Sequence, residues 1–246
     1  SVRKDTGIED AYLKIYPTSG YGSPEIVRQL MSIEKPDAIL HYTDPRFWGW
    51  LYDMEHEIRQ NIPIFYYNIW DDWPAPQYNE NFYESCDLIM NISKQTVSIV
   101  KEVSKRKPRT DWDCTYVPHG INEKQFYPVD KYSDEYKNVE SMRKQLTDDD
   151  IEFIVFYNNR NIRRKLPGDA IMAFKHFCDQ LRTDLPVVAK TVAPDYKVYF
   201  SDNKLTEQQL NYLYNMSDVT INMASNEGFG LGTCESLMAG TPIIVN

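Results

Sequence analysis

The sequence has few cysteines, no long apolar run and no excess of positive charge. Its four cysteines lie far apart without paired spacing, which is typical of a reduced protein and not of a disulfide framework. No apolar run approaches the roughly 20 residues that a membrane-spanning helix needs, and the sequence does not begin with a signal-peptide pattern. We therefore expect a soluble, cytoplasmic protein.

Basic side chains are outnumbered by acidic ones, 27 to 36, which gives a formal net charge of −9. A surface of this sign repels phosphate, so the composition argues against a general nucleic-acid binder. A local basic site is still compatible with this balance.

Short apolar runs alternate with helical patterns along the chain, which is the signature of α/β units around a parallel sheet. The first half opens without an obvious first strand. Its expected helices cover residues 24–31, 50–60 and 95–104, and its expected strands cover 38–42, 64–68, 86–92 and 115–117.

A second α/β set follows a connection over residues 120 to about 150. Thr206 and Gln209 form the pattern of a capping box, and Gly240 supplies a left-handed residue that ends a later helix. The expected helices of this set cover residues 141–146, 168–181, 206–216 and 233–239, and the expected strands cover 152–157, 186–190, 197–200, 219–222 and 242–245.

The two sets predict two doubly wound, Rossmann-like domains that face each other across a cleft. The first domain covers residues 1–118, and the second, with the linker, covers 119–246. The chain also stops on a buried strand without a closing helix, so we expect both ends to be incomplete.

One segment carries most of the chemical information, a strand that leads into a glycine-rich loop and then into a helix. Glycines let backbone N–H groups approach a ligand, and the start of a helix favours negative charge, so the segment suits a diphosphate. Glu235, expected in the first turn of the helix, would accept hydrogen bonds from a ribose diol. Glu227, at the loop entrance, would accept them from the hydroxyls of a sugar attached to that diphosphate.

The string from Glu227 to Glu235 resembles the E-x7-E signature of the retaining GT-B glycosyltransferases, glycosyltransferase family 4 (glycosyl transferases group 1) in particular. Upstream, Arg160 and Lys165 match the spacing of an Arg and a Lys that clamp the donor phosphates in that family. Residues 117–122 are similar to the family's linker into the donor domain, where His119 would border the cleft. The likeness spans most of residues 24–246.

The resemblance implies a hexosyltransferase of GT-B architecture, with the acceptor side in residues 1–118 and the nucleotide-sugar donor site in 119–246. Glu227 would orient the sugar and Glu235 the ribose. Arg160, Lys165 and the loop would stabilise the departing diphosphate while the anomeric configuration is retained. The loop residues are Gly228, Phe229, Gly230, Leu231, Gly232 and Thr233.

The chain departs from the family pattern after the strand at residues 64–68, where family members commonly have a His near the reacting sugar. Here the strand is followed by Ile69, Trp70, Asp71 and Asp72. Asp71 or Asp72 would take over that role by accepting a hydrogen bond from the sugar or the acceptor. The alternative is a turn that starts the next segment.

The expected partners are a nucleotide-sugar donor and a carbohydrate or lipid-linked acceptor, with no metal, no other cofactor and no nucleic acid. A basic run after a predicted helix is either a solvated helix end or a patch that docks on the inner face of an anionic membrane. The run consists of Lys101, Lys105, Arg106, Lys107 and Arg109. The donor base, the sugar and the acceptor cannot be read from these residues.

Three other functions remain open. A metal-dependent glycosyltransferase would hold a divalent ion through Asp111 and Asp113 or through residues 148–150, and it would lose activity in EDTA. A sugar-nucleotide epimerase would turn over the donor without an acceptor. A non-catalytic nucleotide-sugar-binding or interaction module, derived from a transferase, would bind the nucleotide without transferring a sugar.

Overall fold

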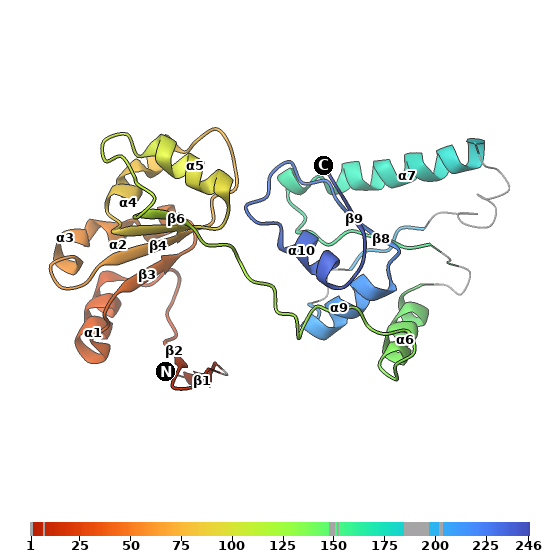
Figure 1. Cartoon of the computed structure of the whole chain (residues 1–246), viewed down its shortest axis with the longest axis horizontal. Helices are drawn as coiled ribbons and strands as arrows, with labels where there is room; N and C mark the ends of the chain where they lie inside the picture. Colours follow the sequence, from red (N-terminus) through yellow and green to blue (C-terminus); the bar gives the residue numbers. More distant parts are fainter. Residues whose placement is uncertain (1, 7, 148–150, 152, 185–196, 202–203) are drawn as a thin grey trace. The chain divides into compact units, whose positions relative to one another are not determined.

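The computed structural model describes the chain except residues 1, 7, 148–150, 152, 185–196 and 202–203 (Figure 1). The chain divides into two compact units, Ser1–Pro118 and His119–Asn246. We call them unit 1 and unit 2. None of the helices in the described part combines the length and apolarity that crossing a lipid bilayer requires.

Unit 1 is built on a four-stranded parallel sheet with the order β3-β4-β5-β6. Its core is apolar, with Ile58, Ile64, Ile89 and Ile99 fully buried. Helix α5 packs against β5 and β6. The strands are β3 (Ile39–Tyr42), β4 (Ile64–Asn68), β5 (Leu88–Asn91) and β6 (Cys114–Tyr116), and the longer helices are α1 (Pro24–Glu34) and α5 (Lys94–Val103).

The predicted helix over residues 50–60 is wrong as a single element. The chain forms the 3-10 helix η1 (Pro45–Trp48) and the short helices α2 (Gly49–Asp53) and α3 (Glu55–Ile58). The break falls at Met54, whose N–H bonds to Leu51 O at 3.2 Å and whose side chain is buried in the core. A second pair, η2 (Gln77–Asn79) and α4 (Glu80–Glu84), lies in a stretch for which no element was predicted.

An antiparallel hairpin, β1 (Val2–Asp5) with β2 (Tyr12–Ile15), precedes the sheet of unit 1. The sequence did not predict it. The side chains of β2 are all exposed, so no buried face imposes the alternation by which a strand is recognised.

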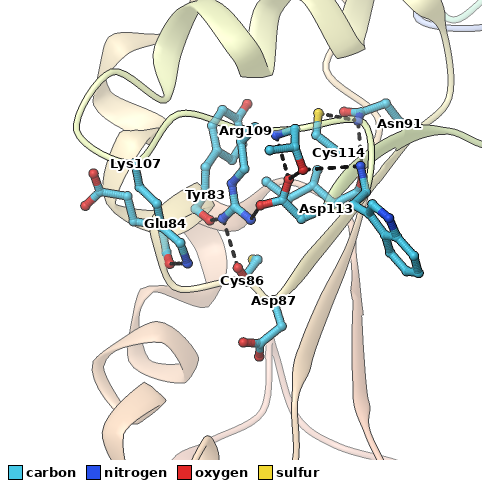
Figure 2. Close-up of polar contacts among 12 residues, drawn as sticks. Tyr83, Glu84, Cys86, Asp87, Asn91, Lys107, Arg109, Asp113 and Cys114 are labelled. Atoms are coloured by element: carbon cyan, nitrogen blue, oxygen red, sulfur yellow. Dashed lines mark hydrogen bonds and ion pairs between the residues drawn. The ribbon is translucent and has the colours of Figure 1, made fainter.

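One residue of the basic run, Arg109, is not part of a solvated helix end, because its side chain is fully buried in unit 1. Figure 2 shows its guanidinium among the backbone oxygens of Tyr83 and Cys86 and the carboxylate of Asp113. It donates to both carbonyls, at 2.9 Å for Cys86, and lies 3.0 Å from Asp113 Oδ2. Elsewhere in the run, Arg106 pairs with Glu80 and Glu84, and Lys101 with Asp111.

Unit 2 has a parallel three-stranded sheet with the order β7-β8-β9. Helix α10 packs against β9 and α9, and α9 packs against α6. The strands are β7 (Val155–Phe156), β8 (Val219–Asn222) and β9 (Ile243–Val245), and the helices are η3 (Arg163–Lys165), α6 (Tyr136–Leu146), α7 (Pro167–Asp184), α9 (Glu207–Met216) and α10 (Leu231–Met238).

Two local predictions in unit 2 are confirmed. Thr206 Oγ1 accepts from Gln209 N at 3.2 Å, and Gln209 Oε1 accepts from Thr206 N at 2.9 Å, which is the capping box at the start of α9. Gly240, just after α10, has φ +80, and a Cβ there would lie 3.3 Å from Pro128 Cγ, so both conformation and space favour glycine.

The predicted strand over residues 197–200 is wrong, since this stretch has no regular structure. All four side chains are exposed, and a run of strand-forming residues does not form a ladder without a partner strand and a face to bury. The predicted strand over residues 186–190 lies outside the described residues.

Candidate nucleotide-sugar site

The carboxyl end of β8 leads through a glycine-containing loop into α10, in the strand–loop–helix order that the sequence predicts. Gly230 is the residue before the helix and has φ +81, a conformation that L side chains rarely adopt. A hollow of about 230 Å³ opens over this loop. Its lining includes Asn222, Ala224, Ser225, Asn226, Glu227, Phe229, Gly230 and Thr233.

Glu227 lines this hollow and forms an ion pair with Lys165 of η3. Its Oε1 also accepts from Asn222 Nδ2 at 3.3 Å, and its Oε2 is 4.0 Å from Arg164 Nη1. Lys165 is almost fully buried, so its charge is held against Glu227 and away from bulk water. Two residues that are 62 positions apart in sequence, and that were predicted to act on the donor, are therefore in contact.

Asn222 was not among the predicted site residues, although it connects several parts of the hollow. Its Nδ2 lies 3.3 Å from both Glu227 Oε1 and Thr233 Oγ1. Its Oδ1 accepts from Asn159 Nδ2 at 3.2 Å and from Ala224 N at 3.1 Å. The signal available in the sequence was a polar residue at the carboxyl end of a buried parallel strand, where ligands bind in open α/β sheets.

Glu235 does not lie in the first turn of α10, as the sequence predicted, because the helix begins at Leu231 and not at Thr233. It is half-buried one turn further on, where its Oε2 accepts from Tyr214 OH at 2.8 Å. Burial raises the pKa of the Glu235 carboxyl, and the hydrogen bond from Tyr214 opposes that rise. The structure therefore gives Glu235 a fixed partner that the sequence did not reveal.

Arg160, Arg164 and His119 differ in the contacts that they make. Arg160 is exposed, and no hydrogen bond or ion pair of its guanidinium is formed with the described residues. Arg164, which the sequence did not single out, donates from Nη1 to Asn226 O at 2.9 Å. The His119 ring lies edge-on to Phe229, with the ring centroids 5.3 Å apart, and burial lowers the pKa of the imidazole.

Asp71 belongs to unit 1, where it is partly buried in the loop after β4. Of the aspartates considered for a metal, Asp113 accepts from Thr110 N at 2.7 Å and pairs with Arg109, and Asp111 pairs with Lys101. Residues 148–150 lie outside the described part. Within that part, no group of three or more His, Cys, Asp and Glu side chains could hold a metal ion.

Helix α10, which carries Glu235, is tied to the sheet by buried hydroxyls. Ser236 Oγ lies 2.8 Å from Thr220 Oγ1 on β8, and it donates to Thr241 O at 3.0 Å. Thr241 Oγ1 in turn donates to Tyr214 O at 2.6 Å, at the end of α9. The helix after the glycine loop is thus fixed by directional bonds on its buried side.

No family model matches the chain, and no match is found among the curated proteins. Solved structures do match. HepE of Anabaena, in complex with UDP and glucose, is 12% identical with a TM-score of 0.60, over 90% of this chain and 62% of that one. Sucrose-phosphate synthase of Thermosynechococcus elongatus is 17% identical with a TM-score of 0.63, over 90% of this chain and 58% of that one.

A third match is the UDP-forming α,α-trehalose-phosphate synthase of Burkholderia vietnamiensis, 13% identical with a TM-score of 0.56, over 90% of this chain and 58% of that one. These structures are GT-B glycosyltransferases, and the likeness shows that this chain has the same α/β fold class with parallel sheets. The chain spans about three fifths of their length, 62% and 58% for the first two.

Proposed function

We propose that this protein is a retaining, family 4-like glycosyltransferase that moves a sugar from a nucleoside diphosphate to an acceptor hydroxyl, with its donor site in unit 2. The acceptor would be a carbohydrate or a lipid-linked carbohydrate. The observation that carries the proposal is the contact between Lys165 and Glu227 at a hollow that the loop before α10 lines. A cation, a carboxylate and a glycine-containing helix start are the groups that a diphosphate-linked sugar needs.

In this proposal each group acts on one part of the donor. The diphosphate lies at the loop before α10, where backbone N–H groups and the helix start favour negative charge. Arg160 and Lys165 stabilise the charge that develops on the leaving diphosphate. Glu227 accepts hydrogen bonds from the sugar hydroxyls, and Glu235 accepts one from the ribose.

The neighbours named above support this choice of donor. HepE has been solved with UDP-glucose, at a TM-score of 0.58 and 14% identity. A trehalose-6-phosphate synthase structure, with a TM-score of 0.56 and 14% identity, concerns glycosyl transfer with retention. We therefore propose UDP-sugars as the first donors to test and retention as the stereochemical outcome.

The deciding experiment is a thermal-shift titration of the chain with UDP, GDP, ADP and their common sugar conjugates. One nucleotide should raise the melting temperature, because a ligand that binds only the folded state stabilises it by about 2.7 kcal/mol at 100 times its Kd. Arg160→Ala and Glu235→Ala should lose most of this shift. Arg163→Ala, which removes an exposed cation at the start of η3, is the charge-matched control and should keep it.

A folded protein that none of these nucleotides stabilises would exclude the proposed donor site. If binding is found, transfer is tested with a panel of sugar acceptors in the presence of EDTA. We expect activity to persist there, since the proposed site uses Arg160 and Lys165 in place of a metal. The anomeric configuration of the product, read by NMR, decides between retention and inversion.

A non-catalytic, nucleotide-sugar-binding module is the second candidate. It is favoured because Lys165 and Glu227 neutralise each other and because no His stands in residues 69–74, directly after β4. It predicts nucleotide binding without transfer to any acceptor, and without hydrolysis of the donor, by the full-length protein.

A further inference from the structure

Tyr214 is held in place by contacts of its ring and of its backbone. Its side chain, on α9, is fully buried. The ring packs edge-on against Phe156 and Phe126, with centroids 5.3 Å and 6.1 Å away. Its backbone oxygen accepts from Thr241 Oγ1 at 2.6 Å. Ring and backbone are both fixed, so the hydroxyl has a fixed position.

The direction of the two hydrogen bonds at this hydroxyl follows from the groups involved. Asn158 Nδ2, after β7, donates to Tyr214 OH at 3.0 Å. An amide nitrogen can only donate, so the phenol accepts there and keeps its single proton for its other partner. That partner is Glu235 Oε2, at 2.8 Å. Tyr214 is therefore a donor to the carboxylate.

The hydroxyl also lies at the first turn of α10. A Cβ at Gly232 would lie 3.6 Å from Tyr214 OH and 3.4 Å from Asn158 O. Because Gly232 has no side chain, its backbone lies close to both residues. The loop after β7, helix α9 and helix α10 thus meet at one phenol. No hydrogen-bond partner of Glu235 Oε1 is formed within the described part of the chain.

We propose that Tyr214 is a positioning residue for nucleotide binding, which holds Oε2 of Glu235 and leaves Oε1 to accept a hydrogen bond from a hydroxyl of the bound nucleoside. This inference rests on the proposed function and names a residue that acts through Glu235. Tyr214 itself does not touch the nucleotide.

Electrostatics support this role. Burial raises the pKa of the Glu235 carboxyl, and the Tyr214 hydrogen bond is what lowers it. Burial and Tyr214 are the causes of the Glu235 shift, and no charged side chain of the described residues contributes to it. Of the elements packed against α10, α9 supplies Tyr214 and β9 carries Ile243, Ile244 and Val245. The neighbouring Cys234 is a thiol whose own pKa is raised, mainly by burial. Without the phenol, the carboxyl would be protonated at a higher pH and would become a weaker acceptor.

The test compares Tyr214→Phe with Tyr212→Phe. Tyr212 lies on the same helix, and its hydroxyl lies 3.1 Å from Glu135, away from Glu235. UDP binding is measured by calorimetry from pH 5 to pH 8, with GDP or ADP in its place if one of them is the nucleotide that binds. At pH 7 Tyr214→Phe should weaken binding roughly tenfold, the size expected for a hydrogen bond to a charged group. The loss should grow as the pH falls, and Tyr212→Phe should bind as the wild type does.

Two further measurements separate positioning from a merely structural role. In a Glu235→Ala background, Tyr214→Phe should cause no additional loss, because the residue acts through Glu235. A carboxyl-carbon NMR titration is run without ligand, and the Glu235 signal is identified because it is absent from the spectrum of Glu235→Gln. This signal should titrate at a higher pH in Tyr214→Phe than in the wild type.

Either of two results would overturn the inference while leaving nucleotide binding intact. One is a folded Tyr214→Phe that binds UDP like the wild type at every pH. The other is an equal loss with and without Glu235. If the wild type binds none of UDP, GDP and ADP, the proposed function fails and this inference fails with it.

Discussion

The guanidinium of Arg109 is enclosed in unit 1, where it satisfies the carbonyls of Tyr83 and Cys86 and pairs with Asp113. Removing it would take one donor from each of the two carbonyls and the ion-pair partner from Asp113, and a buried polar group that loses a partner costs free energy. The contacts join the end of α4 to the loop before β6, so they connect segments that are distant in the sequence.

We expect Arg109→Met to lower the free energy of unfolding by about 3 kcal/mol, the size found when one partner of a buried ion pair is removed. Arg106→Met is the matched control. Its side chain is more than half exposed, so its pairs with Glu80 and Glu84 should contribute less than about 1 kcal/mol. Urea unfolding of both variants measures the difference. Equal losses would show that the burial of Arg109 has no energetic consequence.

A second residue-scale prediction concerns His41, whose pKa burial lowers to about 4 while Asp44 acts in the opposite direction. The folded state disfavours the protonated ring, so its contribution to stability is complete above the unfolded pKa of about 6.5 and is lost as the pH falls toward 4. The loss should approach about 3.5 kcal/mol at most, taking about 1.4 kcal/mol for each pKa unit.

Unfolding of the wild type and of His41→Gln is compared at pH 7 and at pH 5. The glutamine keeps a hydrogen-bonding group near Tyr52 OH, to which His41 Nδ1 lies at 2.7 Å, but it does not titrate. The variant should lose less stability between the two pH values than the wild type does. An identical pH dependence would contradict the assignment to His41.

The residues that the sequence revealed are those whose signal is local. Glu227 and Glu235 stand out because glycines lie between them, and Lys165 because it follows Arg160 at a known spacing. Tyr214 and Asn158 meet across 56 positions, and no short pattern records such a contact. Burial also depends on contacts between residues that are distant in the sequence, so the sequence alone did not distinguish Arg109 from the solvated residues of the basic run.

At the scale of elements, α9 carries both Tyr214 and the capping box at its start. Thr206→Ala should lower the stability of the protein by about 1 kcal/mol, because it leaves a helical N–H without its acceptor. Thr206→Ser keeps the hydroxyl and is the control. Thermal unfolding followed by circular dichroism compares the two, and a serine variant as unstable as the alanine variant would show that the loss comes from packing of the methyl group.

Two inner strands were predicted with the bounds that the structure has. Strands β4 and β8 lie where the apolar and polar patterns placed them, because each is paired on both sides within its sheet. The helix over residues 50–60 is interrupted because Met54 turns into the core, and helical periodicity does not record where an axis bends. The exposed run over 197–200 has strand-like residues but no sheet to join.

At the scale of the whole molecule, the division into two units predicts which part of the chain a bound nucleotide protects from hydrogen exchange. In hydrogen exchange followed by mass spectrometry, UDP should slow exchange in unit 2 over residues 222–235, which include most of the hollow's lining, and over 158–165, which include the Glu227 partner Lys165. The strands β3 to β6 of unit 1 should exchange as before. Protection confined to unit 1 would contradict the proposed donor site in unit 2.

The bonds that join Ser236 Oγ to Thr220 Oγ1 and to the backbone oxygen of Thr241 have a mechanical consequence. A hydrogen bond fixes both the distance and the direction between its two groups. Helix α10 is therefore anchored on its buried side to β8 and to the turn before β9. If the proposed donor site is correct, the loop before α10 is the part that would adjust to a ligand, while the helix axis stays in place.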